Sequence, residues 1–496
     1  MRREATRKGR SITPDSRRQV GIWVALEARI CQILRDLAPG CVNAWDTPAD
    51  MTFPDELRRI PMPLRLAIAN VALAGLTFVT GILLARSLGT AGRGVYGSLF
   101  LWALTIANIF AWGAQITLAR QAAQAPERAA VLYRCAYRMS AIGGWGGAFV
   151  YLAAVLPATS GGSNYPVWLV IVASLIIPFS IPNAFQIQIE LGRARFGSFN
   201  FVRGSFAVLN FLTIAALWLA NVHSVGVFVC VLVGTALAAT TAAMLAIRRS
   251  LRGLPRTPVP TVAQTVRAST PIALTMLVSG LGQQSDKLLA SAIFGPSVVG
   301  VYLVAATLAQ IQSLVGEALA QMFFARGAAV TDLAQIDRAW LGLRLRQTVL
   351  IYAAICAVAL VIVPRLVPVL YGAEFVGAVP LLYLLLPGMA LQGMVRPFEE
   401  YLRGLNMPRI LVMVAMVEIG LVGLGGVAAV VQREPMLLAG GTIAGFAAAL
   451  LTAAIALGKR LGVSPWSLVR PRISDAIALI DTLVRRLRGH GSTASG

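Results

Sequence analysis

The sequence is poor in charged residues, histidine and cysteine, and these shortages exclude several classes of protein. Only 13% of its 496 residues are charged, whereas soluble domains are closer to a quarter charged. Its two histidines are far apart, and none of its five cysteines forms a C-x-x-C pair. Because a metal site needs several such ligands to converge, we expect neither a metal site nor a disulfide framework.

Motifs of common enzyme classes are also missing. The sequence contains no G-x4-G-K-[ST] phosphate loop, so ATP hydrolysis by that route is not expected. It contains no G-x-S-x-G elbow, the turn that carries the nucleophile of serine hydrolases. We therefore expect that the protein is not an enzyme and uses no cofactor, although a gradient of H⁺ or Na⁺ could drive it.

Long hydrophobic segments are what the sequence does contain. Its residues are 57% hydrophobic, and its mean hydropathy is +0.73. Many segments reach roughly 18–25 residues, enough to cross a hydrocarbon core of about 30 Å. This pattern predicts an all-α polytopic membrane protein with about twelve transmembrane helices. The predicted spans lie near 66–85, 95–118, 137–157, 166–188, 203–220, 224–247, 268–285, 298–323, 347–370, 376–398, 408–431 and 436–457.

The distribution of basic residues predicts the orientation of these spans. Arginines gather in the loops after the even-numbered spans and in both tails, whereas loops 158–165 and 221–223 contain no Lys or Arg. By the positive-inside rule both termini are cytoplasmic. The exception is the first outer loop, which carries Arg86 and Arg93.

The net charge of +22 follows mostly from this topology signal. The basic N-terminal extension, residues 1–63, fits attraction to anionic lipid headgroups better than nucleic-acid binding. We expect the lipid bilayer as a partner and no nucleic acid.

One short motif occurs twice, half a chain apart. Residues 89–96 (GTAGRGVY) and 295–302 (GPSVVGVY) share the pattern G-x4-G-V-Y. Six predicted spans separate the copies, which indicates two six-helix lobes of the same orientation, as in one class of secondary transporter. We expect each copy to join the first two helices of its lobe, with Tyr96 and Tyr302 at the membrane interface. The alternative is chance similarity between glycine-rich loops.

This repeat divides the sequence into five parts. We predict a cytoplasmic extension (1–63), an N-lobe (64–247), a cytoplasmic linker (248–267), a C-lobe (268–460) and a cytoplasmic tail with an amphipathic helix (461–496). Prolines in the linker favour an extended connection.

Three segments, 85–104, 283–308 and 371–388, resemble the Wzx-type polysaccharide flippases of the MOP (multidrug/oligosaccharidyl-lipid/polysaccharide), MATE-like exporter superfamily. The resemblance covers about residues 64–460. It implies a V-shaped bundle that moves lipid-diphosphate-linked oligosaccharide from the cytoplasmic to the outer leaflet of a bacterial inner membrane by alternating access. The implied partners are the polyprenyl-diphosphate-linked oligosaccharide and the glycosyltransferases and polymerase of a polysaccharide pathway.

Polar residues inside the predicted spans are the candidates for a functional site. An ionisable group at membrane depth is costly, so it usually faces protein or a wet cavity. We expect amides to bind sugar hydroxyls and cations to bind the diphosphate. The substrate-binding candidates are Arg86, Gln115, Gln283, Lys287, Gln310, Gln321, Gln392 and Arg396. The candidates for binding a coupling ion are Asp286, Glu317 and Glu418.

Structural roles are the alternative for several of these residues. Asp286 and Lys287 could pair with each other, and Arg396 could be neutralised by Glu399 or Glu400 on the same helix. Arg396 approaches the cytoplasmic end of its span, which favours the structural role for it.

A drug exporter of the same superfamily, coupled to H⁺ or Na⁺, is the alternative function. Such exporters usually carry a membrane carboxylate in the first lobe, whereas the first six predicted spans contain none, and Glu190 lies at the cytoplasmic end of the fourth. A peptidoglycan-precursor flippase is a closer rival, but it is expected to have fourteen spans. A non-transporting scaffold would not need the polar stripes of the eighth and tenth spans.

Overall fold

A computed structural model describes residues 62–160, 166–251, 261–328, 330, 336–478 and 481. Nearly all of the predicted extension, residues 252–260 of the linker and the end of the tail with most of its amphipathic helix lie outside these residues. The chain divides into two units, Met1–Gly75 and Leu76–Gly496. The features below belong to the second unit, except the part of the first helix that precedes Leu76.

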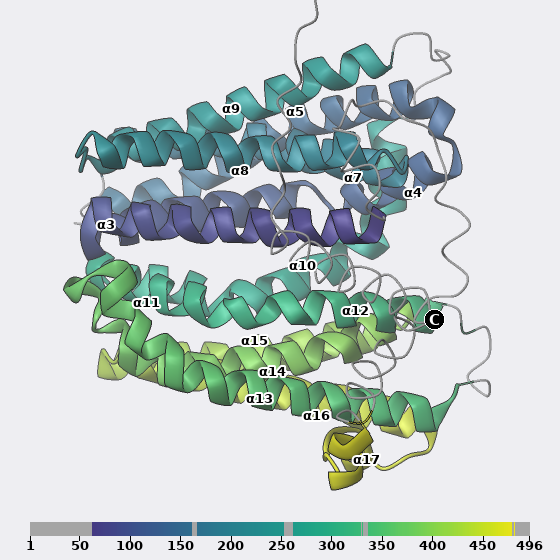
Figure 1. The fold of residues 1–496 in the computed structure, drawn as a ribbon. Helices are drawn as coiled ribbons and strands as arrows, with labels where there is room; N and C mark the ends of the chain where they lie inside the picture. The colour runs from purple at the N-terminus through teal and green to yellow at the C-terminus, as the bar shows by residue number, and fades with distance from the viewer. Residues whose placement is uncertain are drawn as a thin grey trace, which may run out of the picture. The chain divides into compact units, whose positions relative to one another are not determined.

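All regular secondary structure in the described residues is helical (Figure 1). The longer helices before residue 251 are α3 (Met62–Phe110), α4 (Ala114–Gln124), α5 (Ala129–Ser160), α6 (Val167–Ser174), α7 (Ile176–Gly192), α8 (Phe196–Leu219) and α9 (Val225–Ser250). The later ones are α10 (Val262–Ile293), α11 (Pro296–Ala309), α12 (Ser313–Ala328), α13 (Arg338–Tyr371), α14 (Ala378–Gly404), α15 (Pro408–Gln432), α16 (Pro435–Leu461) and α17 (Pro465–Val469). We call α3–α9 the N-lobe and α10–α16 the C-lobe.

The helices account for the predicted spans. In the described part of the chain, nine helical segments are long and apolar enough to cross a membrane. The first, Ala69–Phe110, contains two arms that meet at Gly89, where the backbone leaves helical geometry (φ 64°, ψ −173°). Helix α10 and the pair α11–α12 cover the seventh and eighth predicted spans, although they fall outside those nine. The predicted all-α polytopic class is confirmed, and the protein is a multi-pass membrane protein.

Several predicted spans are interrupted. The second, predicted as continuous over 95–118, breaks after Phe110, where Trp112 and Gly113 adopt positive φ angles of 50° and 63°. The fourth consists of α6 and α7, which meet at Leu175. The eighth contains a 3-10 turn at Gln310–Gln312, so its polar stripe does not follow one continuous helix.

Helices extend into the connection that the sequence predicts between the lobes. Helix α9 continues to Ser250 and α10 begins at Val262, so both lie partly within the predicted 248–267 linker. Thr261 and Gln264 form a capping box that starts α10 before the predicted membrane segment. This box satisfies backbone N–H groups of the first turn, which allows the helix to begin outside the apolar region.

Each lobe has its own hydrophobic core. One core contains buried residues from Leu84 to Ile247, and the other runs from Ala290 to Leu468 with the addition of Ala85. Phe78 and Ile82 also pack against the second core, so the first arm of α3 contributes to both cores.

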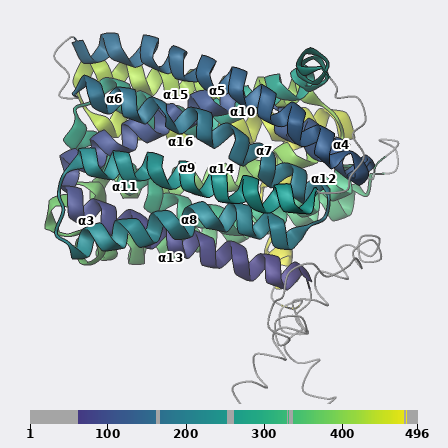
Figure 2. The same cartoon turned by 90° about the horizontal axis from the view of Figure 1, so that it is seen from above.

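Helix α10 lies between the two sets of helices (Figure 1). It contacts α4 and α5 of the N-lobe and α11, α15 and α16 of the C-lobe. In the N-lobe, α8 and α9 run side by side in both views (Figures 1 and 2). Any movement of one lobe against the other must therefore change the contacts of α10.

Candidate functional site

A cavity of about 190 Å³ lies between the lobes, and we call it the interlobe cavity. The second arm of α3, the break at Gly113 and the start of α4 form one wall, and α10 forms the other. Its polar lining residues are Thr105, Asn108, Gln115 and Gln284. The side-chain oxygen of Gln115 is buried without a hydrogen-bond partner. These amides and the hydroxyl suit an uncharged polar ligand.

The break between α3 and α4 brings the lobes together beside this cavity. Gly113 lies against α10, where a Cβ would come within 2.9 Å of the backbone nitrogen of Ala273. Nearby, Trp112 Nε1 donates to Thr270 Oγ1 at 3.2 Å, and Ser269 Oγ donates to Thr117 Oγ1 at 2.8 Å. A glycine is needed here because both its positive φ and the close backbone approach exclude a side chain. These contacts hold α4 against the first half of α10.

Lys287 lies on the face of α10 that lines the interlobe cavity. Its Nζ donates to Oε1 of the lining residue Gln284 at 2.9 Å, and the residue is 6% exposed. One turn further on, Ser291 Oγ accepts a hydrogen bond from Trp102 Nε1 of α3 at 2.9 Å. Residues 284, 287 and 291 share one face because three or four positions make a helical turn. Lys287 therefore lies between the cavity and this contact with the N-lobe.

No ion pair neutralises the Lys287 ammonium in the part of the chain that the structure describes. The neighbouring Asp286 accepts a hydrogen bond from Tyr302 at 3.2 Å, and it interacts with the Lys287 ammonium electrostatically without forming an ion pair. A buried cation without a paired anion is costly, so the site is suited to receive one.

The two copies of the G-x4-G-V-Y motif contact each other. A Cβ on Gly94 would lie 1.8 Å from the carbonyl oxygen of Pro296, and one on Gly300 would lie 1.9 Å from that of Thr90. Thr90 and Pro296 are the second residues of their copies, and Gly94 and Gly300 are the sixth. The same two positions of each copy thus meet across a local two-fold relationship, which we call the repeat contact.

Tyr96 and Tyr302 are buried within the protein. Tyr96 is 5% exposed and Tyr302 is fully buried, so neither ring lies on the protein surface, and their position at the membrane interface stays a prediction. The glycine two positions before each tyrosine, Gly94 or Gly300, allows the backbones of the two motifs to approach closely. The tyrosine rings then pack inside the protein rather than toward lipid. Sequence alone places a tyrosine near the end of a span but does not show which way it faces.

Arg86, a predicted substrate-binding residue, caps a helix end instead. Its Nε donates to the carbonyl oxygen of Leu370 at 2.7 Å and its Nη2 to that of Val369 at 2.5 Å. Both oxygens belong to the last turn of α13, where carbonyl groups lack helical partners. Arg86 is not among the residues that line the interlobe cavity.

A buried polar cluster lies inside the C-lobe. Asp286 accepts from Tyr302, and Thr442 also interacts with the Tyr302 hydroxyl. Glu418, 3% exposed, lies against Gly282, where a Cβ would come within 2.9 Å of its Oε1. That Oε1 has no hydrogen-bond partner. Asp286 and Glu418 are close enough to interact electrostatically, so the two predicted carboxylates come together.

The remaining candidates have less defined surroundings. Gln283 is half-buried, and its neighbour Gln284 lines the cavity instead. Gln392 and Arg396 are half-buried on α14, and Arg396 interacts electrostatically with Glu399 and Glu418. Gln310 is half-buried in the 3-10 turn and Gln321 is exposed on α12. The side chain of Glu317 lies outside the described part of the structure.

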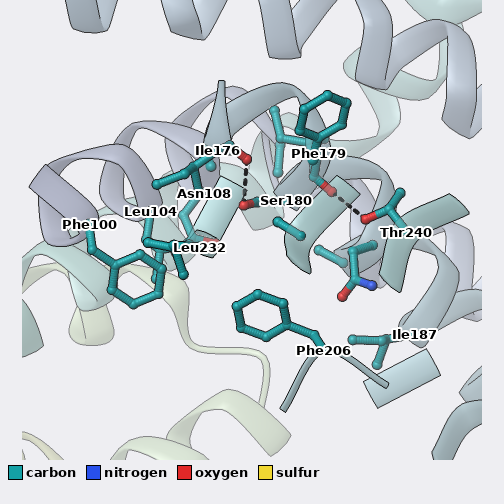
Figure 3. Close-up of a pocket in the computed structure, with 16 residues that line it drawn as sticks. Phe100, Leu104, Asn108, Ile176, Phe179, Ser180, Ile187, Phe206, Leu232 and Thr240 are labelled. Carbon is teal, nitrogen blue, oxygen red and sulfur yellow. Dashed lines mark hydrogen bonds between the residues drawn. The ribbon is translucent and has the colours of Figure 1, made fainter. Parts of the chain in front are cut away.

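A second cavity lies inside the N-lobe (Figure 3). Its volume is about 230 Å³, and Asn108 lines both this cavity and the interlobe cavity. The described residues contain no group of three or more His, Cys, Asp or Glu side chains that could hold a metal ion.

Comparisons with known proteins agree with this arrangement. A model of a family described as polysaccharide biosynthesis protein matches residues 64–323, more than half of the chain. A search of curated proteins finds no match.

Solved structures share the fold at low sequence identity. The lipid II flippase MurJ in an inward closed conformation matches with a TM-score of 0.61 and 14% identity, covering 86% of this chain and 92% of that one. A multidrug resistance MATE family transporter of the MOP superfamily, inward-facing, matches with a TM-score of 0.60 and 16% identity, covering 80% and 99%. A MOP superfamily transporter from Pyrococcus furiosus matches with a TM-score of 0.57 and 14% identity, covering 81% and 96%.

Proposed function

The chain belongs to the polysaccharide biosynthesis protein family, and we propose that it carries lipid-diphosphate-linked oligosaccharide across the bacterial inner membrane. The observation that supports this proposal best is the interlobe cavity with Lys287 at its edge. Amides from both lobes line the cavity, and the buried ammonium beside Gln284 has no paired carboxylate among the described residues. A substrate with a polar sugar and an anionic diphosphate matches both features.

In this proposal the sugar passes through the space between the lobes while the lipid tail stays in the bilayer. Lys287 receives the diphosphate, and Gln115 and Gln284 exchange hydrogen bonds with sugar hydroxyls. With both termini cytoplasmic, the repeat contact lies at the outer end, and its close backbone packing closes that end. Transport then requires the repeat contact to separate while the contacts around Gly113 form or persist.

The coupling ion has a separate place in the proposal. Asp286, Tyr302, Glu418 and Thr442 present carboxylate and hydroxyl oxygens inside the C-lobe. Hard cations such as Na⁺ prefer oxygen ligands, and a carboxylate without a partner can also take up H⁺. The glycosyltransferases and polymerase of the pathway are the proposed protein partners.

A multidrug exporter is the second candidate, because a multidrug MATE transporter shares the fold. The N-lobe offers it little support. Glu190 is buried at the end of α7, and its Oε1 accepts from Tyr133 at 2.8 Å and from Arg193 at 2.7 Å. The residues that line the two cavities include no carboxylate to bind a cationic drug.

Depletion of the protein in its host tests the proposal. We expect lipid-diphosphate-linked oligosaccharide to accumulate on the cytoplasmic leaflet while surface polysaccharide is lost. The measurement is the amount of this lipid and its accessibility to an impermeant sugar-oxidising reagent. Unchanged surface polysaccharide with no accumulation, together with new sensitivity to cationic drugs, would favour the exporter.

A further inference from the structure

The N-lobe cavity has no part in the function proposed so far. It lies between the second arm of α3 and helices α7, α8 and α9. None of its lining residues is ionisable. A cationic ligand would find no counter-charge there, and neither would a phosphate, so the lining selects an uncharged ligand.

The polar groups of this cavity leave hydrogen-bonding capacity for a ligand. Ser180 Oγ and Thr240 Oγ1 donate to the carbonyl oxygens of Ile176 and Phe179, at 2.7 and 3.0 Å, and their oxygens can still accept (Figure 3). The amide nitrogen of Asn183 is buried and has no hydrogen-bond partner among the residues that the structure describes. A buried donor without an acceptor is costly, so an acceptor on a ligand would stabilise it. Asn183 thus supplies a donor and the two hydroxyls supply acceptors.

Three phenylalanines, Phe100, Phe179 and Phe206, also line the cavity. Figure 3 shows the rings of Phe100 and Phe206 on one side, with the hydroxyls of Ser180 and Thr240 across from them. A sugar ring has apolar C–H faces and a rim of hydroxyls, so it can contact aromatic rings and polar groups together. The volume of about 230 Å³ is below the roughly 300–1,000 Å³ of sites for drug-sized ligands. It suits one sugar unit rather than a whole oligosaccharide.

We infer that the N-lobe cavity is a binding subsite for one neutral sugar unit of the transported oligosaccharide, an inference that rests on the proposed function. Asn108 lines both cavities, so the two adjoin at this residue. The diphosphate binds beside Lys287 in the interlobe cavity while one sugar enters the N-lobe past Asn108. The subsite thereby distinguishes a lipid diphosphate that carries its glycan from one that does not.

Binding to the purified full-length protein tests the subsite with two probes. One probe is polyprenyl-diphosphate-linked oligosaccharide isolated from cells depleted of the protein, and the other is polyprenyl diphosphate without sugar. We expect Asn183→Leu to weaken binding of the sugar-bearing probe about tenfold and to leave the sugar-free probe unchanged. Phe206→Leu keeps an apolar side chain but removes the ring, and should weaken only the sugar-bearing probe, about threefold.

Asn210→Leu is the matched control, because Asn210 is an amide of the same lobe with a buried oxygen that lacks a partner, but it does not line the cavity. It should change the affinity for neither probe. Equal weakening of both probes by Asn183→Leu and Phe206→Leu, as expected of an acyl-chain site, would overturn the subsite, and so would no weakening at all. Failure of the unaltered protein to bind either probe would instead overturn the proposed function.

Discussion

Lys287 shows how one residue can be unfavourable for stability and useful for binding. Its ammonium is buried at the edge of the interlobe cavity, with Gln284 as its hydrogen-bond partner and no ion pair in the described residues. Removing a cation from water costs free energy, and a hydrogen bond to a neutral amide offsets only part of that cost. Such a residue is expected where a ligand, rather than the protein, supplies the anion.

Replacing Lys287 with Met should therefore separate function from stability. We expect the thermal stability of the variant to stay close to that of the unaltered protein, because the removal of one buried charge offsets the loss of its electrostatic interaction with Asp286. Its affinity for polyprenyl diphosphate should fall roughly tenfold to a hundredfold, because hydrogen bonds to charged groups contribute about 1.5–3 kcal/mol. Thermal unfolding and binding to the purified protein measure the two effects. Unchanged affinity in a folded variant would remove Lys287 from the site.

Glu418 allows a second prediction at the residue scale. Its Oε1 is buried beside Gly282 without a partner, and Asp286 and Arg396 lie near enough to interact with it. Glu418→Gln keeps the shape of the side chain and removes its charge. We expect transport by the variant in proteoliposomes to lose its response to an imposed H⁺ or Na⁺ gradient.

Glu400→Gln is the control for this experiment. Glu400 lies on α14, where its carboxylate already forms an ion pair with Arg403 of the same helix, so we do not expect it to bind the coupling ion. It should keep the gradient response. If Glu418→Gln also kept the full response, Glu418 would not bind the coupling ion.

At the scale of elements, the repeat contact joins the start of the second arm of α3 to the start of α11. Backbone atoms of the two copies approach so closely that no side chain fits at Gly94 or Gly300. We expect Gly300→Ala to weaken this contact and shift the protein toward a state that is open at the outer end. The measurement is labelling of Ser291→Cys, in a background without native cysteines, by an impermeant maleimide from outside.

Gly295→Ala is a matched control within the same motif, because its Cβ would meet nothing within 4 Å and its φ of −66° suits alanine. Labelling should rise with Gly300→Ala and stay low with Gly295→Ala. Equal labelling in both variants would show that the repeat contact does not close the outer end.

The beginning of the tail is held by one charged pair. Arg346 of α13 donates from Nε and Nη2 to the two carboxylate oxygens of Asp475, at 2.6 and 3.0 Å, and from Nη1 to the carbonyl oxygen of Ser467 at 2.8 Å. These hydrogen bonds hold the pKa of the Asp475 carboxyl below its usual range. The backbone N–H of Arg472 also donates to it.

The direction of this pKa shift fixes the pH dependence of tail docking. Because the pKa is lower in the folded state, the stabilisation is fully present above the unfolded value of about 3.9 and is lost as pH falls through the folded value. Hydrogen exchange of residues 465–478 should therefore show equal docking at pH 8 and pH 5 after correction for intrinsic rates. Asp475→Asn should raise exchange at least about tenfold at pH 7. Loosening of the unaltered tail between pH 8 and pH 5 would contradict this role.

At the scale of the whole molecule, the sequence predicts the fold better than it predicts the site. Apolar segments long enough to cross a bilayer leave few alternatives to membrane helices, and the spacing of the two G-x4-G-V-Y motifs locates equivalent turns. That these motifs touch each other depends on how the lobes pack. No feature of either copy alone shows it.

The positions of the site residues also depend on how the helices pack, which the sequence alone does not show. Lys287 lies beside the interlobe cavity and Gln115 lines it, but Gln284 rather than Gln283 faces the cavity, because the rotation of α10 is set by its contacts with both lobes. Arg86 is polar and near a span end, yet it caps the end of α13 through Leu370, which is 284 residues away in sequence. Ala273 of α10 lies against Gly113, and Gln284 lies further along the same face of α10. Helical spacing could therefore have placed Gln284 at the interlobe cavity, but only once the break at Gly113 was known.

The most direct test of the account is lipid translocation by the purified protein in proteoliposomes. The substrate is polyprenyl-diphosphate-linked oligosaccharide placed in both leaflets, and the readout is the fraction that an impermeant sugar-oxidising reagent can modify. We expect nearly all of the lipid to become accessible with the unaltered protein, only the outer half in vesicles without protein, and a much slower rise beyond half with Lys287→Met. Modification that stops at half with the folded, unaltered protein, while cationic drugs are transported, would contradict it.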